Sequence, residues 1–369
     1  MVQTETEPLA ALRRPTLRDV AARAGVGTST VARVVHNEGY VADDTRRLVL
    51  EAIAATGFRI NAVAQHLRTQ RTDVLGHVLH SISPNPFFAE VALGAEQAAA
   101  ASGRTMLLAL TNGDPDLERR GVEALIQRRV DAILFTTVVD PANVALAVAA
   151  RVPVVQVERP CAVATASVTV DNHRGAWEAT SHLAGLGHRR IACLAVDPGP
   201  SPDHGTPTHH DRVEHERLQG HRDALRDHGL PDDPALLGLA GSYYDMPAAR
   251  TLVGAWLDLP RPERPTAVFA TCDILAAAVL QEVHARRLRV PDDLSLVGFD
   301  DTVADHLAPR LTTVRQPMPE LGQAAVRLAL AAVRGEPAAG TASERLATRL
   351  VVRESTSHPP AGPFPAGPA

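Results

Sequence analysis

Three side chains near the start of the chain have the types and the spacing to read the edges of base pairs. Thr28 and Ser29 are followed one helical turn later by Arg33, in the segment TSTVARVVH. A guanidinium group can donate two hydrogen bonds to a guanine edge, and short hydroxyl side chains let a helix approach the groove end-on. These residues predict sequence-specific contact with duplex DNA, provided that a helix presents them on one exposed face.

Two short helices joined by a sharp turn would present them in this way. The first is expected to start at about Leu17, because Thr16 and Asp19 have the spacing of a capping box, which satisfies the free N–H groups at the start of a helix. Gly25 provides the backbone freedom to end it. The second helix is expected over residues 28–35. Apolar residues recur on one face of each helix and should pack inward: Leu17, Val20, Ala21 and Ala24 in the first, and Val31, Val34 and Val35 in the second.

These residues alone would also fit an ordinary helical hairpin with a polar face, so the charge distribution matters. Residues 11–71 contain ten arginines and five acidic residues, whereas residues 72–369 contain 27 arginines and 35 acidic residues. The net charge of the whole chain, −5, would argue against nucleic acid. Because the basic segment coincides with the expected helices, we expect phosphate binding to be confined to it.

The composition excludes several classes of protein. All 37 basic residues are arginine, so Walker-type phosphate loops and Schiff-base catalysis, which need a lysine amine, are excluded. Cys161, Cys193 and Cys272 are scattered and odd in number, which is typical of reduced thiols in the cytoplasm. There is no apolar signal core and no uncharged apolar stretch of about 18 residues, so we expect neither export nor membrane insertion. We find no catalytic constellation, and we do not expect an enzyme.

The segments around the helical pair complete an N-terminal domain. Residues 1–15 are expected to be a disordered leader, and residues 43–55 a third helix with a capping Asp and with Leu48, Val49 and Ile53 facing inward, which gives a DNA-binding domain at 16–60. Residues 61–72 follow as a linker. Its NAVAQHLR segment is too short to hold a helix alone in water, so it should order only against a partner. Leu67 is apolar in this polar stretch; a flexible linker with one buried leucine is the alternative.

From Val74 onward, short aliphatic runs alternate with amphipathic helices, which predicts parallel sheets with right-handed crossovers. Two such sheets with a cleft between them are expected over residues 73–355, followed by a disordered Pro/Gly/Ala tail at 356–369. Strands are predicted at 74–79, 105–110, 132–135, 152–157, 168–170, 191–196, 267–270, 294–297 and 350–352. Helices are predicted at 87–102, 115–129, 172–186, 212–228, 246–257, 272–288 and 318–334.

Several motifs in one order resemble the LacI/GalR family of bacterial repressors, from about Thr16 to Thr356. The matching stretches include TLRDVAARAGV, NPFFAE at 85–90, VDN at 170–172, LGHRRIA at 186–192 and DDLSLVGFDDT at 292–302. The resemblance implies an α/β fold class: a three-helix helix-turn-helix domain and a hinge, then a two-lobed effector domain like the periplasmic binding proteins. It also implies a homodimer whose heads bind successive major grooves of a near-palindromic operator.

The resemblance assigns roles to single residues of the head and hinge. Thr28, Ser29 and Arg33 take base-reading positions, and Leu67 matches a hinge leucine that wedges into the minor groove and kinks the DNA. The remaining implied DNA-binding positions are Thr16, Thr30, His36, Asn61 and Ala64. Gly27 departs from the family's usual capping serine. Ala32 and His36 replace its usual Ser and Asn phosphate contacts, so DNA affinity is expected to be lower or more sensitive to pH.

In the cleft, the resemblance implies effector contacts from Asn85, Phe87, Asp171, Arg217 and Asp300, with Cys272 where the family commonly has Asn. An arginine with two carboxylates suits a sugar, polyol or nucleoside, whose hydroxyls need both donors and acceptors. Loop capping is the alternative role for Asp171 and Asp300, and an ion pair on a helix is the alternative for Arg217. Effector binding is expected to change the angle between the lobes, melt the marginal hinge helices and so lower operator affinity.

Other signals are weaker. The segment 197–215 contains four histidines, but His210 and His215 lack the i, i+4 spacing of a metal site on a helix, so we expect a mobile loop at the cleft mouth. No metal or cofactor is expected. A dimer is favoured over a tetramer because the proline-rich tail cannot form apolar heptads. Two alternatives from other classes are a solute-binding module of a transporter and a sugar- or nucleoside-modifying enzyme.

Overall fold

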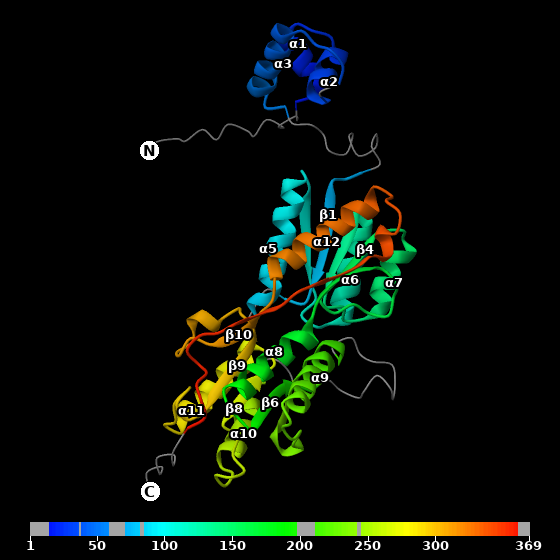
Figure 1. Cartoon of the computed structure of the whole chain (residues 1–369). Helices are drawn as coiled ribbons and strands as arrows, with labels where there is room; N and C mark the ends of the chain where they lie inside the picture. The colour runs from blue at the N-terminus through cyan, green and yellow to red at the C-terminus, as the bar shows by residue number, and fades with distance from the viewer. Residues whose placement is uncertain are drawn as a thin grey trace, which may run out of the picture. The chain divides into compact units, whose positions relative to one another are not determined.

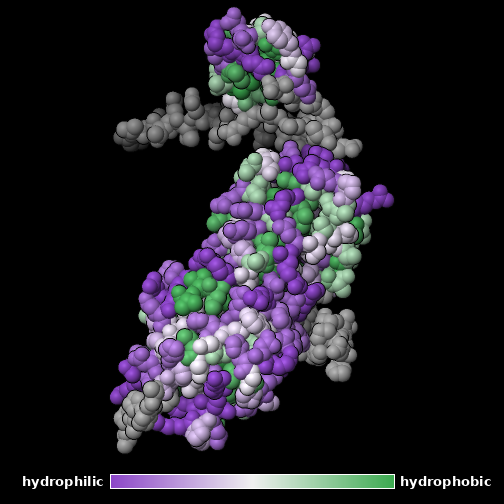
Figure 2. Space-filling model, in the orientation of Figure 1, coloured by the Kyte–Doolittle hydropathy of each residue, from purple (hydrophilic) through white to green (hydrophobic). Residues whose placement is uncertain are grey.

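The computed structural model describes residues 15–36, 38–58, 71–81, 85–197, 211–241 and 245–360, with only the backbone described for His36 and Asp211. The contacts divide the chain into two compact units, residues 1–72 and 73–369 (Figure 1). We call the first the head and the second the effector unit. On the face seen in Figure 2, hydrophilic residues cover most of the surface of each.

The head is a three-helix unit built from α1 (Leu17–Ala24), α2 (Thr28–His36) and α3 (Asp43–Thr56). The predicted capping box is confirmed: the backbone N and the hydroxyl of Thr16 each donate to Asp19 Oδ2 at 2.7 Å. Gly25 ends α1 in the left-handed conformation, with φ of 68°. Residues from all three helices form the core, namely Val20, Ala21, Val31, Val34, Val49 and Ala52.

Two expectations for α3 are wrong. Its N-cap is Ala42, which makes no side-chain cap, so Asp43 and Asp44 lie inside the first turn and favour the helix through its dipole instead. Leu48 is 44% exposed, because Val49, the next residue, takes the inward position.

The effector unit contains two six-stranded sheets, each covered by helices on both faces, and we call the two halves the N-lobe and the C-lobe. The N-lobe sheet has the order β11-β5-β4-β3-β1-β2, and the C-lobe sheet the order β12-β10-β9-β8-β6-β7. The N-lobe strands are β1 (Val74–Leu79), β2 (Thr105–Leu110), β3 (Ala132–Thr136), β4 (Val154–Val157), β5 (Ala166–Val170) and β11 (Ser343–Leu346). The C-lobe strands are β6 (Ile191–Val196), β7 (Leu237–Ala240), β8 (Ala267–Ala270), β9 (Ser295–Asp300), β10 (Thr312–Arg315) and β12 (Arg349–Val351).

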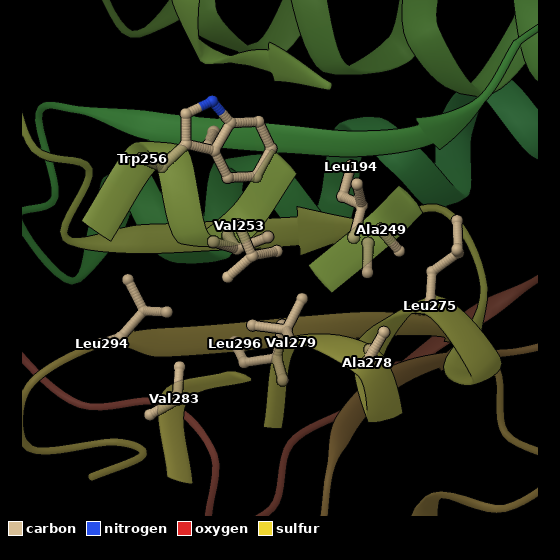
Figure 3. Packing of buried hydrophobic residues seen from close by; sticks show 14 of the residues in the cluster. Leu194, Ala249, Val253, Trp256, Leu275, Ala278, Val279, Val283, Leu294 and Leu296 are labelled. Atoms are coloured by element: carbon tan, nitrogen blue, oxygen red, sulfur yellow. The ribbon is translucent and has the colours of Figure 1, made fainter. Parts of the chain in front are cut away.

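Helices on both faces explain why the central strands are apolar along their whole length. In the N-lobe, α5 (Pro86–Ala101) and α12 (Met318–Val333) cover one face, and α6 (Pro115–Gln127) and α7 (Pro141–Ala149) cover the other. In the C-lobe, α8 (Asn172–Gly185) and α9 (Asp211–Asp227) cover one face, and α10 (Met246–Leu257) and α11 (Asp273–Ala285) cover the other. In the α10–α11 layer, Trp256 and Val279 pack in one cluster with Leu194 and Leu296 of the sheet (Figure 3).

The chain passes between the lobes at three places: from β5 to α8, from β10 to α12, and from β11 to β12. Two of these passages are joined directly, because the N–H of Asp171 donates to the carbonyl of Leu346 at 3.0 Å. Every parallel strand of both sheets therefore ends toward this region, where loops from each lobe can meet.

The expected strict alternation of strands and helices is only partly correct. Strand β5 follows β4 without a helix between them, and β12 runs antiparallel to β10. The sequence pattern missed α7 and the strands β7, β10 and β11. These three strands are only four residues long, and β11 alternates between exposed and half-buried positions, so none has the apolar run that marks the central strands.

The expected disorder from Thr356 onward is wrong for the described part of the tail. The carbonyl of Ser355 accepts from the N–H of Leu296 at 2.8 Å, and its hydroxyl accepts from the N–H of Thr312 at 2.8 Å. A histidine contacts the next residues, since a ring nitrogen of His188 lies 2.9 Å from the carbonyl oxygen of Ser357.

Among the described residues, no helix is long and apolar enough to cross a membrane.

Candidate nucleic-acid interface and effector cleft

Helix α2 has the two faces that a recognition helix needs. Val31 and Val34 are buried in the head, whereas Thr28, Ser29 and Arg33 are exposed and Thr30 is half-buried. The first turn of the helix therefore presents two hydroxyl groups to solvent, with a guanidinium group one turn further on. Hydroxyls, a guanidinium and the helix N-terminus are groups that bind base edges and phosphates.

The other predicted DNA-binding residues are placed less completely. The Thr16 hydroxyl is exposed but engaged in the capping box, and His36 is the last residue of α2. Asn61, Ala64 and Leu67 lie outside the described residues. On α3, the Nη2 of Arg47 lies 3.7 Å from Asp44 Oδ1, and its Nη1 lies 3.3 Å from Glu51 Oε1. All three side chains are largely exposed.

Arg217 is the central residue of the predicted effector set. It lies on α9, and 2% of it is exposed. Its Nε donates to Asn172 Oδ1 at 2.9 Å, and its Nη1 donates to the carbonyl of Thr271 at 2.7 Å. Its Nη2 lies 3.7 Å from Asp300 Oδ1, and the guanidinium carbon lies 3.9 Å from the centre of the Phe299 ring. The guanidinium is thus fixed in one orientation by groups of the C-lobe.

Asp300 ends β9 and is also buried, at 3% exposed. Its Oδ1 accepts from Gln316 Nε2 at 2.6 Å, and its backbone has φ of 112°, which L-residues rarely adopt. Burial raises the pKa of Asp300 to about 8, although the nearby Arg217 acts to lower it. The carboxyl group therefore carries a proton more readily than an ordinary aspartate, and it can donate as well as accept hydrogen bonds.

Two neighbours of Asp300 have structural partners. Asp273 accepts from the Thr313 hydroxyl at 2.6 Å and from the N–H of Thr302 at 2.8 Å, and burial raises its pKa to about 7. Cys272 is fully buried and caps α11, with its Sγ 3.5 Å from the N–H of Leu275. Burial raises the pKa of this thiol above its ordinary value, so it stays protonated.

The remaining predicted effector residues take part in local structure. Asn85 caps α5 by accepting from the N–H of Phe87 at 3.0 Å, and Asp171 caps α8 by accepting from the N–H of Arg174 at 3.0 Å. Phe87 is 4% exposed and packs in the N-lobe core. The structure therefore brings Arg217, Asp300 and Cys272 together. Asn85 and Asp171 instead cap helices, and Phe87 lies in the N-lobe core. Their roles toward a ligand stay predictions.

The sequence reasoning missed a second set of buried polar residues beside Arg217. From the C-lobe they are Asn172, Glu214, Thr271 and Gln316, and from the N-lobe Glu158 and Arg159. Glu158, Arg159 and Thr271 directly follow strands that the sequence did predict, so their place at strand ends was a usable signal. Gln316 follows β10, which was not predicted, and Glu214 lies on the first turn of α9, within the last part of the histidine-rich segment 197–215.

Residues of both lobes meet at a pocket of about 90 Å³. Glu158 and Arg159 line it from the N-lobe, and Asn172, Val213 and Glu216 line it from the C-lobe. Two larger surface hollows, of about 640 Å³ between α10 and α11 and about 470 Å³ between α5 and α12, each lie within one lobe. We favour the interlobe region as the effector cleft, because three buried polar residues, Glu158, Arg159 and Asn172, line its pocket from both lobes.

Most of the histidine-rich segment lies outside the described residues, and its last part, residues 211–215, belongs to α9. In the ranges that the structure describes, no group of three or more His, Cys, Asp or Glu side chains has the geometry to hold a metal ion.

Comparisons with known proteins agree with this architecture. Residues 16–61 match the model of the bacterial regulatory proteins, lacI family, and residues 180–356 match that of a periplasmic binding protein-like domain. The HTH-type transcriptional regulator DegA of Bacillus subtilis is 35% identical over 350 residues, which are 93% of this chain and 98% of that protein.

Two solved structures cover the chain almost completely. A transcriptional regulator CelR–cellobiose complex has a TM-score of 0.67 and 33% identity, and the match covers 93% of this chain and 100% of that chain. The lac repressor dimer bound to operator and the anti-inducer ONPF has a TM-score of 0.78 and 25% identity, with 94% and 100% covered. The likeness therefore includes both the head and the effector unit.

Proposed function

The chain belongs to the LacI family of bacterial transcriptional regulators, and we propose that it is a repressor that binds a palindromic operator as a homodimer. In this proposal a small polar effector in the interlobe cleft controls operator affinity. The observation that carries it is the two-faced helix α2, which buries Val31 and Val34 and exposes Thr28, Ser29 and Arg33. The lac repressor, solved as a dimer bound to operator, supports the same assembly for a chain of the same fold.

At the operator, Arg33 donates two hydrogen bonds to a guanine edge, and Thr28 and Ser29 contact neighbouring bases or phosphates. Two heads related by a two-fold axis read two inverted half-sites, which is why the site is palindromic. Leu67, outside the described residues, wedges into the minor groove between the half-sites and kinks the DNA there.

In the cleft, the proposed effector is a sugar or a nucleoside. A fixed guanidinium at Arg217, a carboxyl at Asp300 and the amide of Gln316 offer both donors and acceptors, as vicinal hydroxyls require. Cellobiose in the CelR complex supports the sugar class, since that protein resembles this chain over both units. Effector binding changes the angle between the lobes, and the hinge segments respond because a short helix is marginally stable on its own.

The test uses the purified full-length chain. DNA bound from a pool of random duplexes is sequenced, and the oligomeric state is measured by analytical ultracentrifugation. We expect a dimer that enriches an inverted repeat, and a thermal-shift screen in which one sugar or nucleoside raises the melting temperature and changes operator affinity. A monomer that enriches no inverted repeat would contradict the proposal. A ligand that is chemically converted during the assay would instead support an enzyme.

A further inference from the structure

The interlobe region contains an ion pair between side chains of the two lobes. Arg159, after β4 of the N-lobe, has its Nη2 3.4 Å from Glu214 Oε1 on α9 of the C-lobe. The two side chains are 5% and 1% exposed. We propose that this pair, which we call the interlobe bridge, is a latch that holds the cleft closed in the ligand-free protein.

Each half of the interlobe bridge is anchored in its own lobe. On the N-lobe side, the Nε of Arg159 lies 2.8 Å from Glu158 Oε2, and that carboxylate also accepts from the Thr137 hydroxyl at 3.5 Å. On the C-lobe side, Glu214 Oε2 accepts from the Thr271 hydroxyl at 3.2 Å. Both anchors directly follow strands, Glu158 after β4 and Thr271 after β8, so each charge is tied to the sheet of its own lobe.

Charge balance explains why these buried groups can coexist. Arg159 is shared by two carboxylates, Glu158 and Glu214, while the positive charge of Arg217 has beside it Asp300, whose pKa is raised. Each buried guanidinium group therefore has at least one carboxyl group within 4 Å, Glu158 and Glu214 for Arg159 and Asp300 for Arg217. Separating Arg159 from Glu214 removes a buried contact between opposite charges, which is more costly than separating an exposed pair.

A second contact between the lobes provides the comparison. Arg345 of β11 has its Nη2 3.8 Å from Glu216 Oε1, two residues along α9 from Glu214. Here the side chains are 51% and 24% exposed, and Glu216 is also paired with Arg212 at 3.1 Å. Solvent screens this contact and a second partner competes for it, so it adds little to closure.

The consequence for regulation rests on the proposed function. The ligand-free protein is held at one lobe angle by its own side chains, and an effector that enters the cleft must separate Arg159 from Glu214 or replace their contact. The interlobe bridge therefore sets both the ligand-free operator affinity and part of the cost of effector binding.

Hydrogen exchange measured by mass spectrometry on the full-length, ligand-free chain tests the latch. Glu214→Gln keeps the side-chain shape and leaves Arg159 with Glu158, so the fold is retained. We expect the amides of residues 157–161 and 212–217 to exchange at least tenfold faster than in the unchanged protein. Glu216→Gln, the matched control, should change them less than twofold. Equal exchange in Glu214→Gln and the unchanged protein would overturn the latch.

A double-variant cycle covers the case in which one substitution loosens the whole unit. If faster exchange comes from the broken pair, Arg159→Gln with Glu214→Gln exchanges no faster than either single variant, and the core amides of α5 and α12 stay protected. Additive effects of the two substitutions would overturn the latch.

Operator affinity without effector is measured on the same variants, and a change of at least fivefold is expected for Glu214→Gln alone. Unaltered operator affinity together with unaltered exchange contradicts the latch, whereas loss of all operator preference in the unchanged chain contradicts the proposed function.

Discussion

Two arginines, one exposed and one buried, illustrate how the head and the effector unit orient their functional side chains. Arg33 is exposed on α2 of the head, whereas Arg217 is buried, with hydrogen bonds to Asn172 Oδ1 and the carbonyl of Thr271. The first is oriented by the helix that carries it, and the second by its partners. A side chain that must meet DNA stays in water until it binds, while one that shapes a cleft is fixed in advance. Substitution should therefore affect binding at the first and folding at the second.

The largest effect is expected at the buried arginine. Arg217→Met removes the buried guanidinium that donates to Asn172 Oδ1 and the Thr271 carbonyl and lies beside Asp300, so the free energy of unfolding of the effector unit should fall by about 3–5 kcal/mol. Urea denaturation measures it. Arg226→Met, a mostly exposed position on the same helix, should change the free energy of unfolding by less than about 0.5 kcal/mol. If both substitutions lowered the free energy of unfolding equally, burial of Arg217 would not explain its effect.

The next effect concerns DNA alone. Arg33→Ala should cost about 1–3 kcal/mol of operator binding and relax base preference at one position in each half-site, while the melting temperature stays unchanged. Binding to a panel of single-base operator variants measures it at fixed salt. A uniform loss on every sequence would mean that Arg33 contacts only phosphate.

The cleft also predicts a pH dependence. In the folded chain burial raises the pKa of Asp300 to about 8, from 3.8 in the unfolded chain, so the native state keeps a proton that the unfolded state has lost. The stabilisation of the native state by this proton is complete below about pH 4. It declines as pH rises toward about 8, and the free energy of unfolding then changes by at most about 1.4 kcal/mol per pH unit.

Asp300→Asn should remove that slope, because the amide still accepts from Gln316 but does not titrate. Denaturation of both proteins across the pH range measures the difference between them, which includes the response of Asp273, the carboxyl whose charge helps to raise the pKa of Asp300. Parallel curves would show that Asp300 is an ordinary carboxylate.

The smallest effect is expected in the head. Thr16→Ala removes the hydroxyl half of the capping box, and the head should lose about 1 kcal/mol of stability. Thermal unfolding of the full chain, followed through exchange of α1 amides, measures it. No change would mean that the Asp19 contact to the Thr16 backbone suffices.

The head was predictable because its signals are local. A capping box, a left-handed glycine and apolar spacing within 20 residues place α1 and α2 without knowledge of the rest. Three six-residue strands, β1, β2 and β6, were predictable for the same reason and match their expected bounds. Strand β10, with the sequence TTVR, was missed because it lacks the apolar run by which β8, also four residues long, was predicted.

The cleft was predictable only in part because its partners come from distant segments. Arg217 and Asp300 were identified through a family motif, but their contacts with Asn172, Thr271 and Gln316 depend on how strands of one sheet are ordered. Arg159 and Glu214 are 55 residues apart and belong to different lobes. No local spacing indicates such a pair, and only the folded chain brings it together.

Paired recognition of DNA is the property on which the proposed function rests. Titration of the purified chain with three duplexes of equal length, carrying the selected inverted repeat, one half-site or a random sequence, tests it directly at physiological salt. We predict that the inverted repeat binds at least 100-fold more tightly than the other two, with two chains per duplex. One chain per duplex and the same affinity for all three would contradict it.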